Sequence, residues 1–185
     1  MRFAIWRRID AHGHDAARLT RDEAGWRLEG TAVFVHDEAP ALLSYALELH
    51  PGWATRRARI QGFLGSTTVD VSIVRDADGW LFDGTRVEGL DHLVDLDLQF
   101  TPATNLNHLT RVGLQPGQEA AIPVAWFQPG VDTLVELPQH YRCRDAFTFD
   151  YDASTVGYRE TLRLASTGFV DDYPGLWQLE RTGSR

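Results

Sequence analysis

One pair of aspartates at Asp-x-Asp spacing is the strongest candidate for chemistry in this chain. Asp95 and Asp97 alternate with Val94, Leu96 and Leu98, and this period-two pattern predicts a β-strand. Residues two apart on a strand share a face, so the two carboxylates should stand about 6 to 7 Å apart. Such a pair suits general acid–base chemistry or cation binding, and it equally suits the solvated face of a sheet.

Metal binding has one further candidate. His12 and His14 flank a glycine beside Asp15, and two imidazoles with a carboxylate could ligate a metal. An exposed loop without a metal is the favoured interpretation, because no further strong ligand or rigid supporting element is visible. Phosphate loops, dinucleotide glycine fingerprints, nucleophile elbows and paired-histidine zinc helices are also missing. We therefore expect neither a metal nor a cofactor, and catalysis is the less favoured function.

The elements that must position these residues are strands. Period-two alternation recurs along the chain, turn signals such as Asp78-Gly79 separate the alternating runs, and no run keeps a helical period for three turns. The sequence predicts an all-β fold of antiparallel hairpins, with one or two short helical turns near residues 88–92 and 101–109. We expect strands near residues 2–9, 16–21, 25–36, 41–50, 53–64, 67–75, 79–83, 93–100, 119–127, 131–142, 145–151, 157–165 and 168–172.

Composition bounds the class of protein. With 185 residues, 43% of them apolar and 24% charged, the chain is typical of one globular domain, and we expect a single domain over residues 1–185. The formal charge of -8 disfavours nucleic acid and anionic membranes as partners. No apolar run is long enough to span a bilayer, and charged residues interrupt the N-terminus early, so we expect a cytoplasmic protein.

Several segments resemble a bacterial family named for glycolipid binding, formerly a domain of unknown function. The most specific segment is Asp95-Leu96-Asp97 followed by Phe100-Thr101-Pro102-Ala103-Thr104-Asn105. The other segments match in the same order along nearly the whole chain: Trp6-Arg7-Arg8, Trp53-Ala54-Thr55-Arg56, Ala125-Trp126, Gln139-His140-Tyr141 and Asp172-Tyr173-Pro174-Gly175-Leu176-Trp177. The chain departs from the usual family pattern after Asn105, where one family arginine is missing.

The resemblance implies a single long antiparallel sheet curled into a spiral roll or half-open barrel, similar to periplasmic lipoprotein carriers. It favours a non-catalytic protein that binds a glycolipid-like amphiphile on the concave side of the roll. We expect the apolar chain of the ligand inside the roll and its polar head at a cluster of side chains. The predicted ligand-binding residues are Arg56, Asp95, Asp97, Thr101, Thr104, Asn105, Arg111 and Tyr141.

Two other functions stay open at this point. An enzyme could use Asp95 or Asp97 as general base, with Arg56 or Arg111 binding an anionic substrate. A structural module could instead pair with partners through an exposed sheet edge, and it would form a homodimer without a cavity. The volume and lining of any cavity within the sheet would separate these alternatives.

Overall fold

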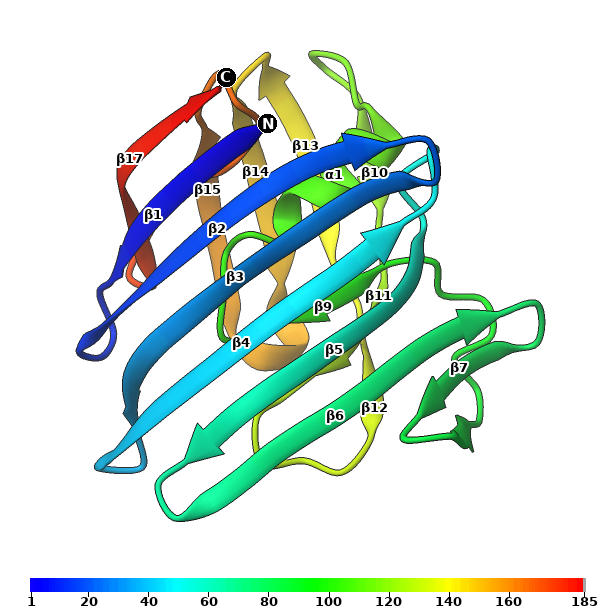
Figure 1. Cartoon of the computed structure of the whole chain (residues 1–185). Coiled ribbons are helices and arrows are strands. Elements are labelled where there is room, and N and C mark those ends of the chain that lie inside the picture. The colour runs from blue at the N-terminus through cyan, green and yellow to red at the C-terminus, as the bar shows by residue number, and fades with distance from the viewer. Residues whose placement is uncertain (185) are drawn as a thin grey trace.

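A computed structural model describes residues 1–184 and shows a protein made almost entirely of antiparallel strands (Figure 1). One continuous sheet contains fourteen strands. Their spatial order is β10 (Glu119–Ala121), β13 (His140–Asp145), β14 (Thr148–Ala153), β15 (Tyr158–Leu164), β16 (Val170–Tyr173), β17 (Trp177–Ser184), β1 (Arg2–Arg8), β2 (Gly13–Asp22), β3 (Gly25–His36), β4 (Ala39–Leu49), β5 (Thr55–Leu64), β6 (Thr67–Asp76), β7 (Gly79–Phe82) and β8 (Thr85–Val87). Within residues 1–184 the two edge strands, β10 and β8, do not pair with each other. The sheet is therefore curled but not closed into a barrel, and the predicted all-β fold is confirmed.

A second, smaller layer lies on the concave side of this sheet (Figure 1). It contains β9 (Leu96–Leu98), β11 (Val124–Phe127) and β12 (Leu134–Leu137), in the order β12-β11-β9 with β9 and β11 parallel. The helix α1 (Asn105–Val112) and the loop of residues 99–104 complete it. We call these segments the inner layer. The sequence did not predict it, because a parallel pair joins strands that are far apart along the chain.

The inner layer divides the protein interior into two cores. Leu98, Phe100 and Phe127 pack with Trp6, Leu43 and other residues of the N-terminal strands. The opposite side of the inner layer contributes a second set, which packs with the C-terminal strands. This second core contains Leu109, Ile122, Val124, Leu137, Tyr141, Cys143, Phe149, Tyr151, Ala153 and Leu162. β9 and β11 are thus buried on both faces, whereas the middle residues of β12 are exposed. Neighbouring residues of β11 face different cores, as the strand period requires.

Local sequence explains the helix. α1 begins after Thr104 and ends at Gly113, whose φ of 63° is left-handed, a conformation that glycine adopts without steric cost. The helix lies a few residues later than the predicted turn at 101–109. A short 3-10 helix, Ser154–Val156, is the only other helical element among the described residues. In the described part of the chain no helix is long and apolar enough to cross a membrane.

The strand predictions are accurate for the N-terminal meander and less so beyond it. The predicted strand at 131–142 is divided, because Leu134–Leu137 joins the inner layer and His140–Asp145 joins the large sheet. The predicted strand at 93–100 is reduced to Leu96–Leu98. Two strands, β8 and β17, were not predicted at all.

Candidate functional site

A cavity of about 250 Å³ lies between the inner layer and the C-terminal strands. Five aromatic side chains, each from a different strand, line it, together with six polar and four aliphatic residues. Its lining residues are Arg8, Asp10, Asp97, Leu98, Gln99, Thr101, Asn105, Trp126, Leu137, Tyr151, Val156, Tyr158, Tyr173, Leu176 and Trp177. Asp10 and Val156 are exposed, which places the mouth of the cavity beside the turn between β1 and β2.

The aromatic rings stand at steep angles to one another. The Tyr151 and Tyr173 ring planes are 87° apart, and those of Tyr158 and Tyr173 are 65° apart, with centroid separations of 5.9 and 5.3 Å. The Tyr158 hydroxyl donates to the carbonyl of Pro174 at 2.7 Å, which fixes one ring against the turn between β16 and β17. Burial raises the pKa of Tyr151 and Tyr173, so both phenols stay neutral. The three rings form a curved, uncharged wall.

Asp97 is the buried carboxyl group of this cavity. It lies in the middle of β9, where Leu96 and Leu98 face the N-terminal core and the intervening side chain faces the other way. Only 8% of Asp97 is exposed. Burial raises its pKa to about 7, and contact with the Gln139 side chain opposes this rise without cancelling it. Near neutral pH the group can therefore hold or release a proton.

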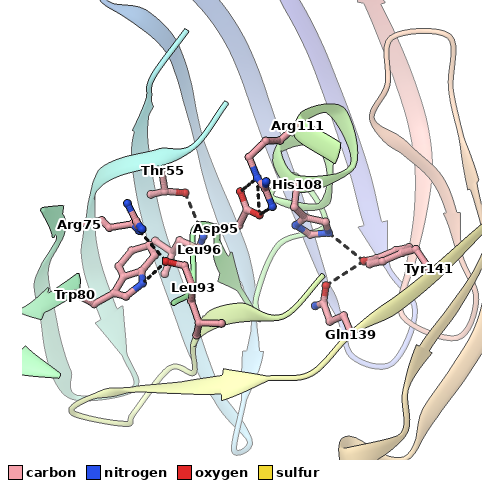
Figure 2. Close-up of polar contacts among 10 residues, drawn as sticks. All are labelled: Thr55, Arg75, Trp80, Leu93, Asp95, Leu96, His108, Arg111, Gln139 and Tyr141. Atoms are coloured by element: carbon pink, nitrogen blue, oxygen red, sulfur yellow. Dashed lines mark hydrogen bonds and ion pairs between the residues drawn. The ribbon is translucent and has the colours of Figure 1, made fainter. Parts of the chain in front are cut away.

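A chain of hydrogen bonds lies behind Asp97. Asn105 donates to the Tyr141 hydroxyl at 3.2 Å, and that hydroxyl donates to Gln139 Oε1 at 3.2 Å. Figure 2 shows His108 and Gln139 approaching the same hydroxyl from different elements, with His108 Nε2 3.0 Å away. Burial lowers the pKa of His108 to about 4, so its imidazole is neutral. The chain ends at the amide of Gln139, beside Asp97.

Asp95 has a different environment, although it lies only two residues away. Arg111 of α1 donates to both of its carboxylate oxygens, with nitrogen–oxygen distances of 2.7 to 3.0 Å (Figure 2). Asp95 is fully buried, and neither partner lines the cavity. This two-pronged ion pair joins the segment just before β9 to α1. Of the two aspartates, only Asp97 therefore faces the cavity.

The loop between β9 and α1 is fastened to the large sheet by a second polar cluster. The hydroxyls of Thr101 and Tyr45 both donate to the buried Asp15. Burial raises the pKa of Asp15 to about 6, which these hydrogen bonds oppose. Thr104 Oγ1 accepts a hydrogen bond from the Leu98 amide at 3.3 Å. Thr101 and Thr104 thus hold the loop in place, and Thr101 also lines the cavity.

The family model described as "Putative glycolipid-binding" matches residues 3–179. The chain belongs to this family. Its fold is similar to the crystal structure of a DUF1089 family protein from Pseudomonas aeruginosa, with a TM-score of 0.79 and 26% sequence identity. The similarity covers 89% of this chain and 90% of that one. No curated protein matches.

Segments that resemble the glycolipid-binding family converge on the cavity from distant parts of the chain. Arg8 comes from the first segment, Asp97 and Asn105 from the most specific one, and Trp126 from a third. The final segment supplies a further three residues: Tyr173, Leu176 and Trp177. The segment Gln139-His140-Tyr141 lies behind the cavity, where its glutamine and tyrosine continue the hydrogen-bond chain described above.

The structure separates the predicted ligand-binding residues into four groups. Asp97, Thr101 and Asn105 line the cavity, whereas Tyr141 supports it from behind. Three others lie within the protein but hold the inner layer together: Asp95, Thr104 and Arg111. Arg56 is not brought to the site. It pairs with Glu48 of β4, which a second arginine, Arg57, also contacts.

Sequence reasoning missed most of the aromatic wall and Arg8. Arg8 donates to both oxygens of Asp10 at 2.8 Å and lies over the ring of Trp177, with 5.5 Å to its centroid. A signal for Arg8 existed in the alternation of β1, because it shares the inward face with Ala4 and Trp6. The tyrosines gave no such signal, since strand pairing alone brings them together.

The histidine pair offers no metal site in this structure. His12 and His14 are exposed, whereas Asp15 points into the protein interior, because adjacent residues of a strand face opposite sides. No group of three His, Cys, Asp or Glu side chains within residues 1–184 is placed to hold a metal ion.

Proposed function

We propose that this protein binds the head group of a glycolipid-like amphiphile in the aromatic cavity, without catalysing a reaction on it. The lining of the cavity is the observation that supports this function. Sugar rings present apolar C–H faces that pack on aromatic side chains, while their hydroxyls need hydrogen-bond donors and acceptors. Trp126 and the tyrosine wall supply the aromatic surface, and Asp97 and Asn105 supply hydrogen-bonding groups for the hydroxyls.

The size of the cavity limits what it holds. Ligand pockets usually enclose about 300 to 1,000 Å³, and this cavity has about 250 Å³. It suits a head group of about one ring. The space within the roll, where we expected the apolar chain of the ligand, is filled by Phe100, Leu106, Phe127 and their neighbours. The apolar chain must therefore leave through the mouth, past Val156 and Leu176.

The enzyme hypothesis finds less support. It needed one of the two aspartates as general base and an arginine free to bind an anionic substrate, but Arg111 is held by Asp95, and Arg56 pairs with Glu48. Only Asp97 faces the cavity. We therefore propose binding and not turnover.

Titration with octyl β-glucoside below its micellar concentration tests this function. Trp126 and Trp177 line the cavity, so binding should change tryptophan fluorescence in a saturable way. Replacing Trp126 with leucine should weaken binding at least tenfold, because a central aromatic contact is lost. A matched control is Trp26→Leu, which changes a tryptophan outside the cavity lining. Circular dichroism would check that both variants fold.

The control ligand is an octyl tetraethylene glycol ether, which has the same apolar chain without a sugar. Equal affinity for the ether and the glucoside would exclude a sugar site in the cavity. Equal losses of glucoside affinity in Trp126→Leu and Trp26→Leu would exclude it too.

A further inference from the structure

Asp97 is the one carboxylate at the cavity without a cationic partner. Arg8 is held by Asp10 and Arg111 by Asp95, each through two or more hydrogen bonds. No ion pair forms on Asp97 among residues 1–184. A buried carboxylate without a counter-ion is unfavourable, so burial favours the protonated form of Asp97 until a cation compensates the charge of the carboxylate.

The wall around Asp97 has the composition of a cation site. The faces of tryptophan and tyrosine rings attract positive charge, most strongly where water is excluded. Five such rings line this one cavity, and Arg8 already lies over one of them, Trp177. The rings left for a ligand cation are Trp126, Tyr151, Tyr158 and Tyr173. The steep angles among the three tyrosines place their rings around the space and not in a parallel stack. Recognition of ammonium groups commonly uses such a cage.

An anionic head group fits the cavity poorly. A phosphate or carboxylate would need a free cation, yet the lining arginine is already neutralised by Asp10. The anion would also meet Asp97 and the formal charge of -8 of the whole chain. A neutral sugar meets neither obstacle, but it leaves Asp97 without a counter-ion.

We propose that the head group bound here carries an ammonium group, which lies within the aromatic cage and pairs with Asp97. An amino sugar is a head group of this class. This inference rests on the proposed function and makes its ligand specific. Binding then transfers the acidic proton of Asp97 to solvent, and the ammonium group of the ligand takes the place of that proton as the partner of the carboxylate.

Other groups that face Asp97 cannot supply this charge. Gln139 and Tyr141 are neutral, and the neighbouring His108 is also neutral because burial lowers its pKa to about 4. On the opposite wall Tyr151 and Tyr173 have raised pKa values and are uncharged. Arg8 and Asp10 at the mouth cancel each other.

Three octyl glycosides test the inference: the glucoside, the 2-amino-2-deoxyglucoside and its N-acetyl derivative. Their apolar chains are identical, and only the second is cationic. At pH 6 we expect the amino glycoside to bind about tenfold more tightly than the other two. Calorimetry in two buffers of different ionisation enthalpy should show release of close to one proton per amino glycoside, because Asp97, with a pKa of about 7, is protonated before binding.

The variant Asp97→Asn should reduce the ratio of the amino to the N-acetyl affinity to about one and abolish proton release. Asp37→Asn is the matched control, because it removes one negative charge from an exposed turn and should keep the tenfold ratio. Equal affinities of all three glycosides for the unmodified protein would overturn the ammonium site but leave the sugar site standing. If no glycoside binds, the proposed function and this inference both fail.

Discussion

Asp95, just before β9, and Asp97, within it, show how far two identical side chains can diverge only two residues apart. The first is bound by the Arg111 guanidinium, and the second faces an uncharged aromatic wall. Their spacing made them equivalent candidates in the sequence. The partners that distinguish them come from α1 and from β11 to β17, and no local pattern specifies those contacts.

The raised pKa of Asp97 makes the stability of the protein depend on pH. Burial raises the pKa of Asp97 to about 7 in the folded protein, from its ordinary value of 3.8 in the unfolded chain. Between these pH values the folded state binds more protons, so the free energy of unfolding falls as pH rises. Asp97→Asn removes this contribution. Relative to the unmodified protein, the variant should gain little stability at pH 4 and up to roughly 4 kcal/mol at pH 8, measured by urea unfolding.

Asp95→Asn is an informative control for that experiment. It leaves Arg111 without its buried partner, which should cost about 3 to 5 kcal/mol at both pH 5 and pH 8. Asp15 contributes the same pH trend as Asp97 but is present in all three proteins. If the free energies of unfolding of Asp97→Asn and the unmodified protein differ by the same amount at every pH in this range, the pKa of Asp97 is not raised by burial.

At the scale of elements, the loop of residues 99–104 is the most sensitive connection. Thr101 Oγ1 donates to Asp15 and accepts from the Ala103 amide at 3.0 Å. Thr101→Val keeps the shape of the side chain but removes both hydrogen bonds. We expect a loss of about 1 to 3 kcal/mol in urea unfolding. The control is Thr68→Val on the exposed face of β6, which should change the free energy of unfolding by less than about 0.5 kcal/mol. Equal losses of unfolding free energy in the two variants would show that the Thr101 hydrogen bonds do not hold the loop in place.

Local alternation and turn residues were enough to predict the meander from β1 to β7. There, each strand pairs with its neighbours in sequence, as in the β3–β4 hairpin that runs from Trp26 opposite Leu49 to His36 opposite Ala39. Prediction failed where pairing is remote. Trp177–Ser184 carries little alternation of its own and is stabilised as a strand by β1, almost a whole chain length away.

The candidate site was predictable only in part, for a related reason. The spacing of Asp95 and Asp97, together with the resemblance of the segment that ends at Asn105, indicated one wall of the cavity. The opposite wall is assembled from Tyr151, Tyr158 and their neighbours on successive C-terminal strands. Each of these tyrosines alone is typical of a strand in any core.

At the scale of the whole molecule, the long sheet should not be uniformly stable. The β3–β4 pair lies far from either edge and has the longest ladder, whereas β8 and β10 are three-residue edge strands. Amide hydrogen exchange should therefore be slowest in β3 and β4 and fastest, among strands, in β8 and β10. Similar protection across all fourteen strands would show instead that the sheet opens as one unit.

The pairing of β1 with β17 also has a consequence for how the protein is made. Phe3 lies opposite Gly183 and Arg7 opposite Gln178, so β1 is synthesised long before its partner β17. Until then β1 has one unpaired edge, which can recruit strands from other chains. The hairpins from β2 to β6 can form during synthesis. The pairing of β1 with β17, which we call the seam, can form only after synthesis reaches β17. Of the strand pairings in the fold, the seam has the greatest sequence separation. Newly made chains are therefore most exposed to aggregation just before the seam closes.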